Sequence, residues 1–252
     1  MKKISLFLVL FFASEVFADT NQAVKETNFN VALSHTEIDN DSMSHWRTTT
    51  LSSGVGFQLY EYLGATVFIH GSKGGKLRYS YYNDSYTTQT DGYGSDAFLF
   101  LRDANIGKIG ASGGYSKTKT TTDIDNTIAT QTFKNTTTSR RYSLYGSYYL
   151  NDFTLSASRE FSDLDNGHTL HYVDASIGYY LNENTAFDAT VSGMDSSNKF
   201  RFNLTHQPSL LRNSTVVGIG YANNDYDDSF TFFLSYHFQT KVSLRTRDRE
   251  YR

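Results

Sequence analysis

The chain has no cysteine, and its 252 residues include only one proline and one tryptophan. The absence of cysteine excludes a disulfide framework, a thiolate zinc site and a cysteine nucleophile. Charge is also scarce, since 19% of the residues are charged and the formal net charge is −3. A protein that binds nucleic acid needs a basic surface, so this balance argues against a nucleic-acid partner. In contrast, 15% of the residues are aromatic, which argues against disorder of the whole chain.

Long hydrophobic runs are missing too, apart from one at the N-terminus. Lys2 and Lys3 precede an apolar run over residues 4–13, and Val16 and Ala18 provide the short side chains that a signal peptidase needs. This order predicts a secretory signal peptide over residues 1–18. A membrane anchor is the alternative, but the run is about half of the roughly 20 residues that a spanning helix requires. An exported chain without cysteine fits a bacterial envelope protein better than a secreted eukaryotic one.

Beyond residue 18, apolar and polar residues alternate with a period of two, and helical periodicity is nearly absent. In residues 173–181, for example, every second residue is apolar or aromatic. A strand shows this alternation when its two faces lie in different environments. Short turns that follow an aromatic residue and a leucine alternate with longer polar stretches, among them residues 74–93 and 119–139. Short turns at one end and long polar loops at the other are typical of an outer-membrane β-barrel.

The sequence therefore predicts an all-β fold, a transmembrane antiparallel up-and-down β-barrel of about twelve strands over residues 19–238. Ten or fourteen strands also fit the pattern, because residues 76–83 form either a loop hairpin or a second pair of strands. The strands are expected at residues 28–38, 46–59, 63–73, 94–102, 106–118, 138–150, 153–163, 168–181, 186–195, 198–206, 213–223 and 228–238.

The last of these strands carries the most specific local signal. Phe230, Phe232, Leu234, Tyr236 and Phe238 form an apolar and aromatic row, with other residues between them. This row resembles the closing strand of Gram-negative outer-membrane proteins, in which such a row and a terminal aromatic residue form an assembly signal. The resemblance extends to the signal peptide and the rhythm of strands and turns. It implies a location in the bacterial outer membrane, with membrane lipid, lipopolysaccharide and the barrel-assembly machinery as partners.

The chain departs from that class at its C-terminus. The aromatic residue is usually the last residue of such proteins, whereas residues 239–252 follow here and include five basic and two acidic residues. Either this segment is a basic periplasmic tail, or the last strand continues through Val242 and Leu244, which keep the same alternation.

A soluble β-sandwich also has alternating strands, because its apolar faces form the core. Two features favour the barrel. Tyrosine and phenylalanine lie at the ends of the apolar rows, as at Tyr148, Tyr179 and Phe238, where amphipathic rings suit a lipid interface. The opposite faces carry glycine, serine, threonine and asparagine, which suit a hydrated lumen.

Charged residues on the expected inward rows are the candidate functional residues, and they line a pore or its constriction: Glu160, Asp174, Asp188, Lys199 and Arg201. Opposed charges at a constriction sort charged solutes. The alternative is a structural ladder of ion pairs in a narrow barrel, since buried charges need partners in either case.

Their relative positions depend on the turns between the strands. A tight turn at residues 196–197 predicts that Arg201 lies opposite Ser192, and a turn at residues 182–184 predicts that Ser192 lies opposite Asp174. Asp174 and Arg201 are then two strands apart at one height in the lumen, about 10 Å from each other.

These features favour a porin-like channel for passive diffusion of small hydrophilic solutes, without catalytic residues, metal or cofactor. A non-conducting structural or adhesive barrel that presents its loops is one alternative, because residues 117–141 are polar and rich in threonine. If this segment folds inward, it narrows the pore instead. A barrel hydrolase that uses His168 and His171 is a weaker alternative, because neither Gly-x-Ser-x-Gly nor His-Glu-x-x-His occurs.

Overall fold

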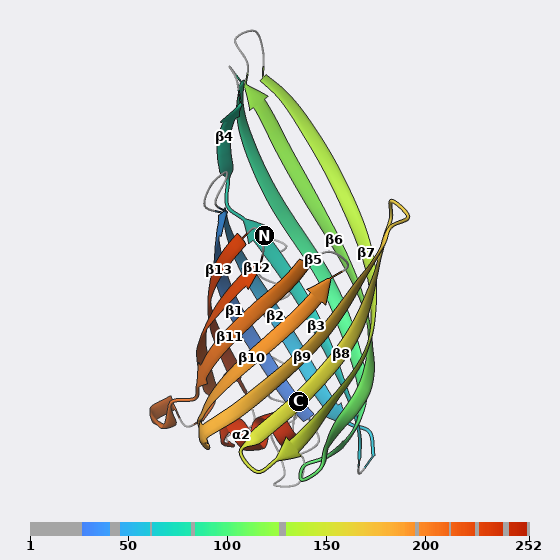
Figure 1. Ribbon diagram of the computed structural model, residues 1–252, viewed down its shortest axis with the longest axis vertical. Coiled ribbons are helices and arrows are strands. Elements are labelled where there is room, and N and C mark those ends of the chain that lie inside the picture. Colours follow the sequence, from blue (N-terminus) through green and yellow to red (C-terminus); the bar gives the residue numbers. More distant parts are fainter. Residues whose placement is uncertain are drawn as a thin grey trace.

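A computed structural model describes residues 27–40, 46–60, 62–81, 84–125, 130–194, 197–211, 213–224, 227–238 and 242–250. The expected signal peptide lies outside these residues. Within them, thirteen antiparallel strands form one sheet, which closes because β3 pairs with β5 (Figure 1). β4 pairs only with β5 and stands outside the closed ring, so the barrel wall has twelve strands. The prediction of a twelve-strand up-and-down barrel is confirmed.

The strands and the helix that follows them have these bounds: β1 (Thr27–Asn40), β2 (Trp46–Gln58), β3 (Leu63–Gly74), β4 (Leu77–Tyr81), β5 (Asp84–Asp103), β6 (Gly107–Asp125), β7 (Thr130–Leu150), β8 (Phe153–Leu164), β9 (Thr169–Asn182), β10 (Thr185–Met194), β11 (Ser197–His206), β12 (Thr215–Asn224), β13 (Asp227–His237) and α2 (Leu244–Glu250). A 3-10 turn (Ser209–Leu211) lies between β11 and β12. In the described part of the chain, no helix has both the length and the apolar character to cross a membrane.

Alternation along each strand separates an apolar exterior from a polar lumen. On β9, Val173 and Ile177 are 54% and 45% exposed on the outside, while Asp174 and Ser176 between them face inward and are half-buried. Aromatic residues gather near the short-turn end, where the rings of Phe153 and Tyr179 pack across β8 and β9 with centroids 4.7 Å apart. Large apolar side chains thus face outward in a closed sheet that leaves no strand edge open in its wall.

Three strands are much longer than a membrane requires. β5, β6 and β7 have 20, 19 and 21 residues, against the roughly 9–11 of a spanning strand. Their extra residues rise past the other strands at the long-loop end (Figure 1), by about 30 Å at 3.3 Å per residue.

The prediction of loops at residues 74–93 and 119–139 is therefore wrong over most of both stretches. Threonine pairs join the extended strands, as between Thr88 and Thr122 at 3.1 Å and between Thr90 and Thr120 at 3.3 Å. Both faces of this sheet are polar, so the sequence has no apolar alternation to reveal it. The extension projects away from the barrel, so the alternative of a segment that folds inward and narrows the pore is also wrong. Of residues 76–83, residues 77–81 form β4, which pairs with β5 at the side of the extension.

Replacing Ile177 by lysine should test the lipid-facing side of the wall. A lysine on the lipid face lowers the free energy of unfolding by up to about 2–4 kcal/mol, the full value being reached at the middle of the bilayer. The neighbouring Ser176→Lys variant places the same charge in the lumen and should lose much less stability. Urea unfolding in lipid vesicles, followed by the fluorescence of the single tryptophan, Trp46, measures both. Equal losses in the two variants would contradict the assignment of the two faces.

Candidate functional site

An ion pair that the sequence did not reveal spans three strands inside the lumen. Asp96 of β5, Gly114 of β6 and Arg141 of β7 lie in one row across the sheet. Because Gly114 has no side chain, Arg141 reaches over β6, and its Nη2 donates to both carboxylate oxygens of Asp96 at 2.8 and 3.0 Å. Nδ1 of His70 on β3 lies 3.6 Å from the same carboxylate. Asp96 is only 20% exposed, so solvent screens this pair only in part.

Two of the predicted residues lie near this ion pair. Glu160 of β8 is within electrostatic range of Asp96, Arg141 and Asp174. Asp174 of β9 accepts a hydrogen bond from Oγ of Ser158 at 3.2 Å. Asp96 and Glu160 therefore lie near Arg141, and Asp174 extends this group of carboxylates to β9.

The other predicted residues lie on β10 and β11. Asp188 accepts hydrogen bonds from Oγ1 of Thr190 at 3.1 Å and from Nδ2 of Asn203 at 3.2 Å. Lys199 is within electrostatic range of Arg201 and of Asp227 on β13. The strand alternation places Lys199, Arg201 and Asn203 on one face of β11, because Asn203 pairs with Asp188 of the lumen.

The registers correct one predicted pairing. Ser192 lies opposite Asp174, as the sequence predicts, but its partner on β11 is Lys199 and not Arg201. Arg201 lies opposite Thr190, because the hairpin closes with Met194 opposite Ser197, one residue earlier than expected. Moving a turn by one residue shifts the partner by two and keeps every side chain on its face. Asp174 and Lys199 thus share one row, two strands or about 10 Å apart.

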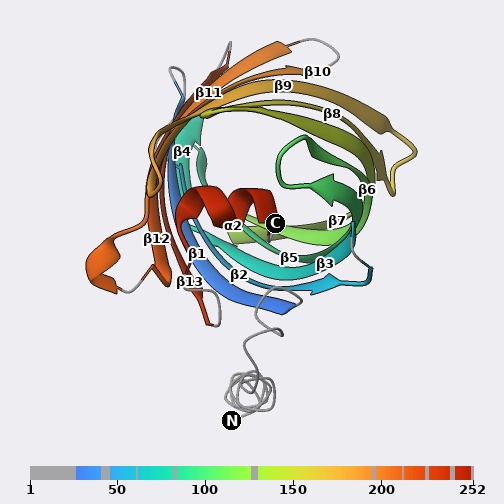
Figure 2. The ribbon, with the colours of Figure 1, turned by 90° about the horizontal axis from the view of Figure 1, so that it is seen from below.

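A short helix lies across the short-turn end of the lumen. β13 ends at His237, so the last strand does not continue through Val242 and Leu244, and Leu244–Glu250 form α2 instead. Figure 2 shows α2 inside the ring of strands. It contacts β10 and β5, which are five steps apart in the twelve-strand ring, so it crosses most of the lumen.

Three arginines hold α2 in this position. Arg247 is fully buried and donates to Oε1 of Gln207 and, at 2.7 Å, to the backbone carbonyl of Asn213. Arg245 and Arg249 both donate to the backbone carbonyl of Asn151. Asn151 and Asn213 have φ values of 49° and 56°, which asparagine tolerates better than most residues. The β7–β8 turn and the β11–β12 connection therefore present backbone carbonyl oxygens to the arginines of α2.

Aromatic rings and carboxylates of the barrel also contact the arginines of the helix. The guanidinium of Arg249 lies over the rings of Tyr149 and Tyr180, 4.9 and 5.6 Å from their centroids. Arg245 forms ion pairs with Asp152 at 2.8 Å and with Glu183 at 3.3 Å. A cavity of about 300 Å³ lies next to α2 and is lined mainly by residues of β6 to β11, together with Phe233 of β13 and Asp248.

The predicted assembly signal lies at the outer surface. Phe230, Phe232, Leu234 and Tyr236 face outward and are between 39% and 62% exposed. Phe238 follows the end of β13, and its ring packs against Tyr236 at 4.8 Å and against a phenylalanine of β1 at 4.9 Å. The row therefore borders the membrane, and recognition by the assembly machinery stays a prediction.

The histidines considered for a hydrolase form no catalytic arrangement with each other. His168 lies in the β8–β9 turn, where its backbone NH donates to Oδ1 of Asn166, and the ring of His171 packs edge-on against Phe161 at 5.3 Å. No cluster of three or more histidine, aspartate or glutamate side chains that could hold a metal ion occurs in the described ranges.

Two substitutions should test the Asp96–Arg141 pair. Arg141→Met removes the donor, and Gly114→Ala places a methyl group against the Asp96 carboxylate. Each should lower the free energy of unfolding by about 1–3 kcal/mol, and the double variant should lose little more because both remove the same interaction. Gly113→Ala is the control, because its methyl group would meet only the backbone carbonyl oxygen of Arg141, at an ordinary contact distance of 4.0 Å. Fully additive losses in urea unfolding would argue against the pair.

Comparison with known proteins shows the fold. No protein-family model and no curated protein sequence matches the chain. Among solved structures, the translocator domain of the autotransporter NalP from Neisseria meningitidis has a TM-score of 0.63 at 10% identity, covering 93% of this chain and 95% of its own. The β domain of the Bordetella autotransporter BrkA has a TM-score of 0.58 at 11% identity, and the match covers 84% of this chain and 99% of that domain. The Pseudomonas putida toluene transporter TodX has a TM-score of 0.52 at 8% identity, and the match covers 85% of this chain and 90% of the transporter. The chain has the fold of a bacterial outer-membrane β-barrel.

Proposed function

We propose that this protein is a channel of the bacterial outer membrane through which small hydrophilic solutes diffuse passively. The observation that carries the proposal is the charged, hydrogen-bonding lumen wall, with carboxylates on β5, β8 and β9 and with two cations on β11, two strands from β9. Twelve strands at about 4.8 Å spacing and a tilt near 40° give a barrel about 24 Å across between backbones, wide enough for a hydrated path.

In this proposal, α2 forms the narrowest part of the path. A helix with its side chains is about 10–12 Å wide, so it occupies much of the lumen where it crosses. The arginine contacts to the turns hold it there, and the cavity next to Asp248 is the part of the lumen that remains beside it. The short-turn end is the periplasmic end in barrels of this kind. Solutes therefore meet α2 last on their way inward.

The outward faces support the proposed location and partners. The exposed apolar belt suits membrane lipid, with lipopolysaccharide around the half that carries the long strands. The row that ends in Tyr236 and Phe238 suits recognition by the barrel-assembly machinery.

Removing α2 should increase single-channel conductance. A variant that ends at Phe238 keeps all barrel strands and lacks the helix, so its conductance in planar bilayers should rise about two-fold or more. Thr246→Ala, which keeps all three arginines, serves as the control and should conduct like the unaltered protein. A heat-modifiable gel shift verifies that each variant is folded. Equal conductance of the truncated and full-length proteins would exclude α2 as the constriction.

Ion selectivity tests the cations of β11. The double variant Lys199→Ala, Arg201→Ala removes two positive charges from the lumen, so the reversal potential in a salt gradient should shift toward cation preference. Lys117→Ala with Lys119→Ala removes two positive charges from the outward face of β6 and should leave the potential unchanged. An unchanged reversal potential in the Lys199 and Arg201 variant would contradict their place on the path of the solutes.

One observation favours a second function, a non-conducting surface barrel. The extended sheet of β5, β6 and β7 forms a tall polar surface at the long-loop end, suited to adhesion or display. This function requires that neither the full-length nor the truncated protein conducts, although both show the gel shift of a folded barrel.

A further inference from the structure

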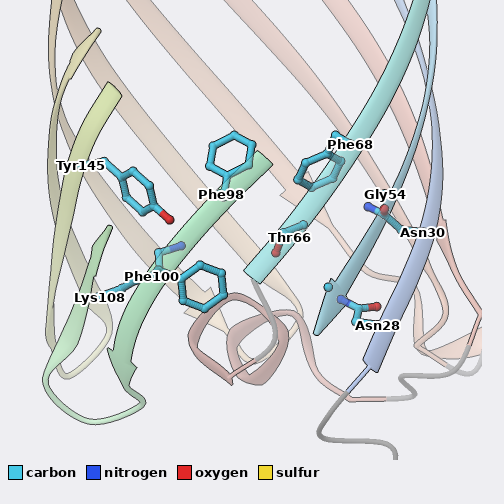
Figure 3. Close-up of a pocket in the computed structure, with 10 residues that line it drawn as sticks. Asn28, Asn30, Gly54, Thr66, Phe68, Phe98, Phe100, Lys108 and Tyr145 are labelled. Atoms are coloured by element: carbon cyan, nitrogen blue, oxygen red, sulfur yellow. The ribbon is translucent and has the colours of Figure 1, made fainter. Parts of the chain in front are cut away.

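The lumen wall contains a second cavity whose chemistry differs from that of the charged sectors. It measures about 280 Å³ and lies against the inner face of β1, β2, β3, β5, β6 and β7 (Figure 3). Four rings form its walls: Phe68, Phe98, Phe100 and Tyr145. Phe98 meets Phe68 edge-on with centroids 5.7 Å apart and meets Tyr145 at 6.1 Å. We call this cavity, with its four rings, the aromatic niche.

Glycines on neighbouring strands make room for these rings. A Cβ atom on Gly64 would lie 2.5 Å from the ring of Phe100. A Cβ atom on Gly110 would lie 2.8 Å from Cβ of Phe100 and 2.7 Å from the hydroxyl of Tyr145. The rings therefore pack down onto the wall. The space that the rings leave between them is a cavity in the wall of the lumen, large enough for a small ligand.

One cationic side chain, that of Lys108, lines the aromatic niche. Nζ of Lys108 lies 5.5 Å from the ring centroid of Phe100 and 5.4 Å from that of Tyr145. Among the described residues that line the niche, Lys108 is the only charged one, and the polar remainder comprises Asn28, Asn30 and Thr66. Lys108 also lines the cavity next to α2, so the niche adjoins the central lumen at this residue.

We propose that the aromatic niche binds a small organic carboxylate, with an aromatic ring between the phenylalanines and the carboxylate at Lys108. An apolar pocket with a few placed polar groups is the usual form of a small-molecule site. An apolar cavity of about 150 Å³ is known to hold benzene, so the niche has room for a phenyl ring with a short acid chain. The ammonium group of Lys108 favours an anion through a charge-assisted hydrogen bond.

This inference deepens the proposed function, since it names a class of solute that reaches the niche through the lumen. Binding to the niche does not require that a solute passes through the channel, so binding and conductance are tested separately. Titration calorimetry on the full-length mature protein in detergent micelles compares 3-phenylpropionate with its uncharged analogue 3-phenyl-1-propanol and with acetate. The phenyl acid should bind at least about ten-fold more tightly than either.

Substitutions assign the binding to the niche. Lys108→Met should weaken binding of 3-phenylpropionate about ten-fold and leave the alcohol unaffected. Phe98→Ala should weaken the binding of both ligands. If the alanine variant does not fold, Phe98→Leu is measured in its place. Lys199→Met removes a lumen cation outside the niche and should leave binding of the acid unchanged.

The outcomes separate the two proposals. Absence of saturable binding, or equal binding of the acid to the unaltered protein and to Lys108→Met, would overturn the niche. Binding by a protein that does not conduct would support the niche and overturn the channel. Conductance without binding of the acid would support the channel and overturn the niche.

Discussion

Backbone hydrogen bonding in lipid is the constraint on which the rest of this structure depends. The hydrocarbon core offers no water, so every spanning strand must pair on both sides. Pairing of β1 with β13 and of β3 with β5 completes that circle, and the short β4 stays outside it. Once the circle is closed, each side chain of the wall faces either lipid or lumen. A chain with few charges and no long apolar run in its barrel therefore still covers the outside of a barrel with apolar side chains.

Inside the ring, glycine decides which side chains meet. Gly114 allows Arg141 to reach Asp96 across an intervening strand, and Gly64 and Gly110 allow the ring of Phe100 to lie against the wall. The absence of a side chain at glycine thus shapes both a charged sector and an apolar sector of the same lumen. The helix α2 uses a different device, in which arginines bind backbone carbonyls of short turns.

Much of this architecture was accessible from the sequence. The alternation, the turn rhythm and the closing row that includes Phe230 and Phe232 predict the class of fold, the strand number and most strand positions. The inward face of Asp174 follows from the same alternation, and its pairing with Ser192 follows from the expected turn at residues 182–184. The polar extension of β5 to β7 was missed because strands exposed to water on both faces have no apolar period, and their threonines then resemble loop residues.

By itself, the sequence determined the pattern of apolar and polar faces, because a period of two is a local property of the chain. Only the tertiary structure decided which inward residues meet. Asp96 and Arg141 are 45 residues apart, and the short C-terminal helix binds turns that are far from it along the chain. The register of each hairpin, the closure of the ring and the direction of the chain after His237 set those contacts. These are long-range geometric properties that the period of a single strand does not contain.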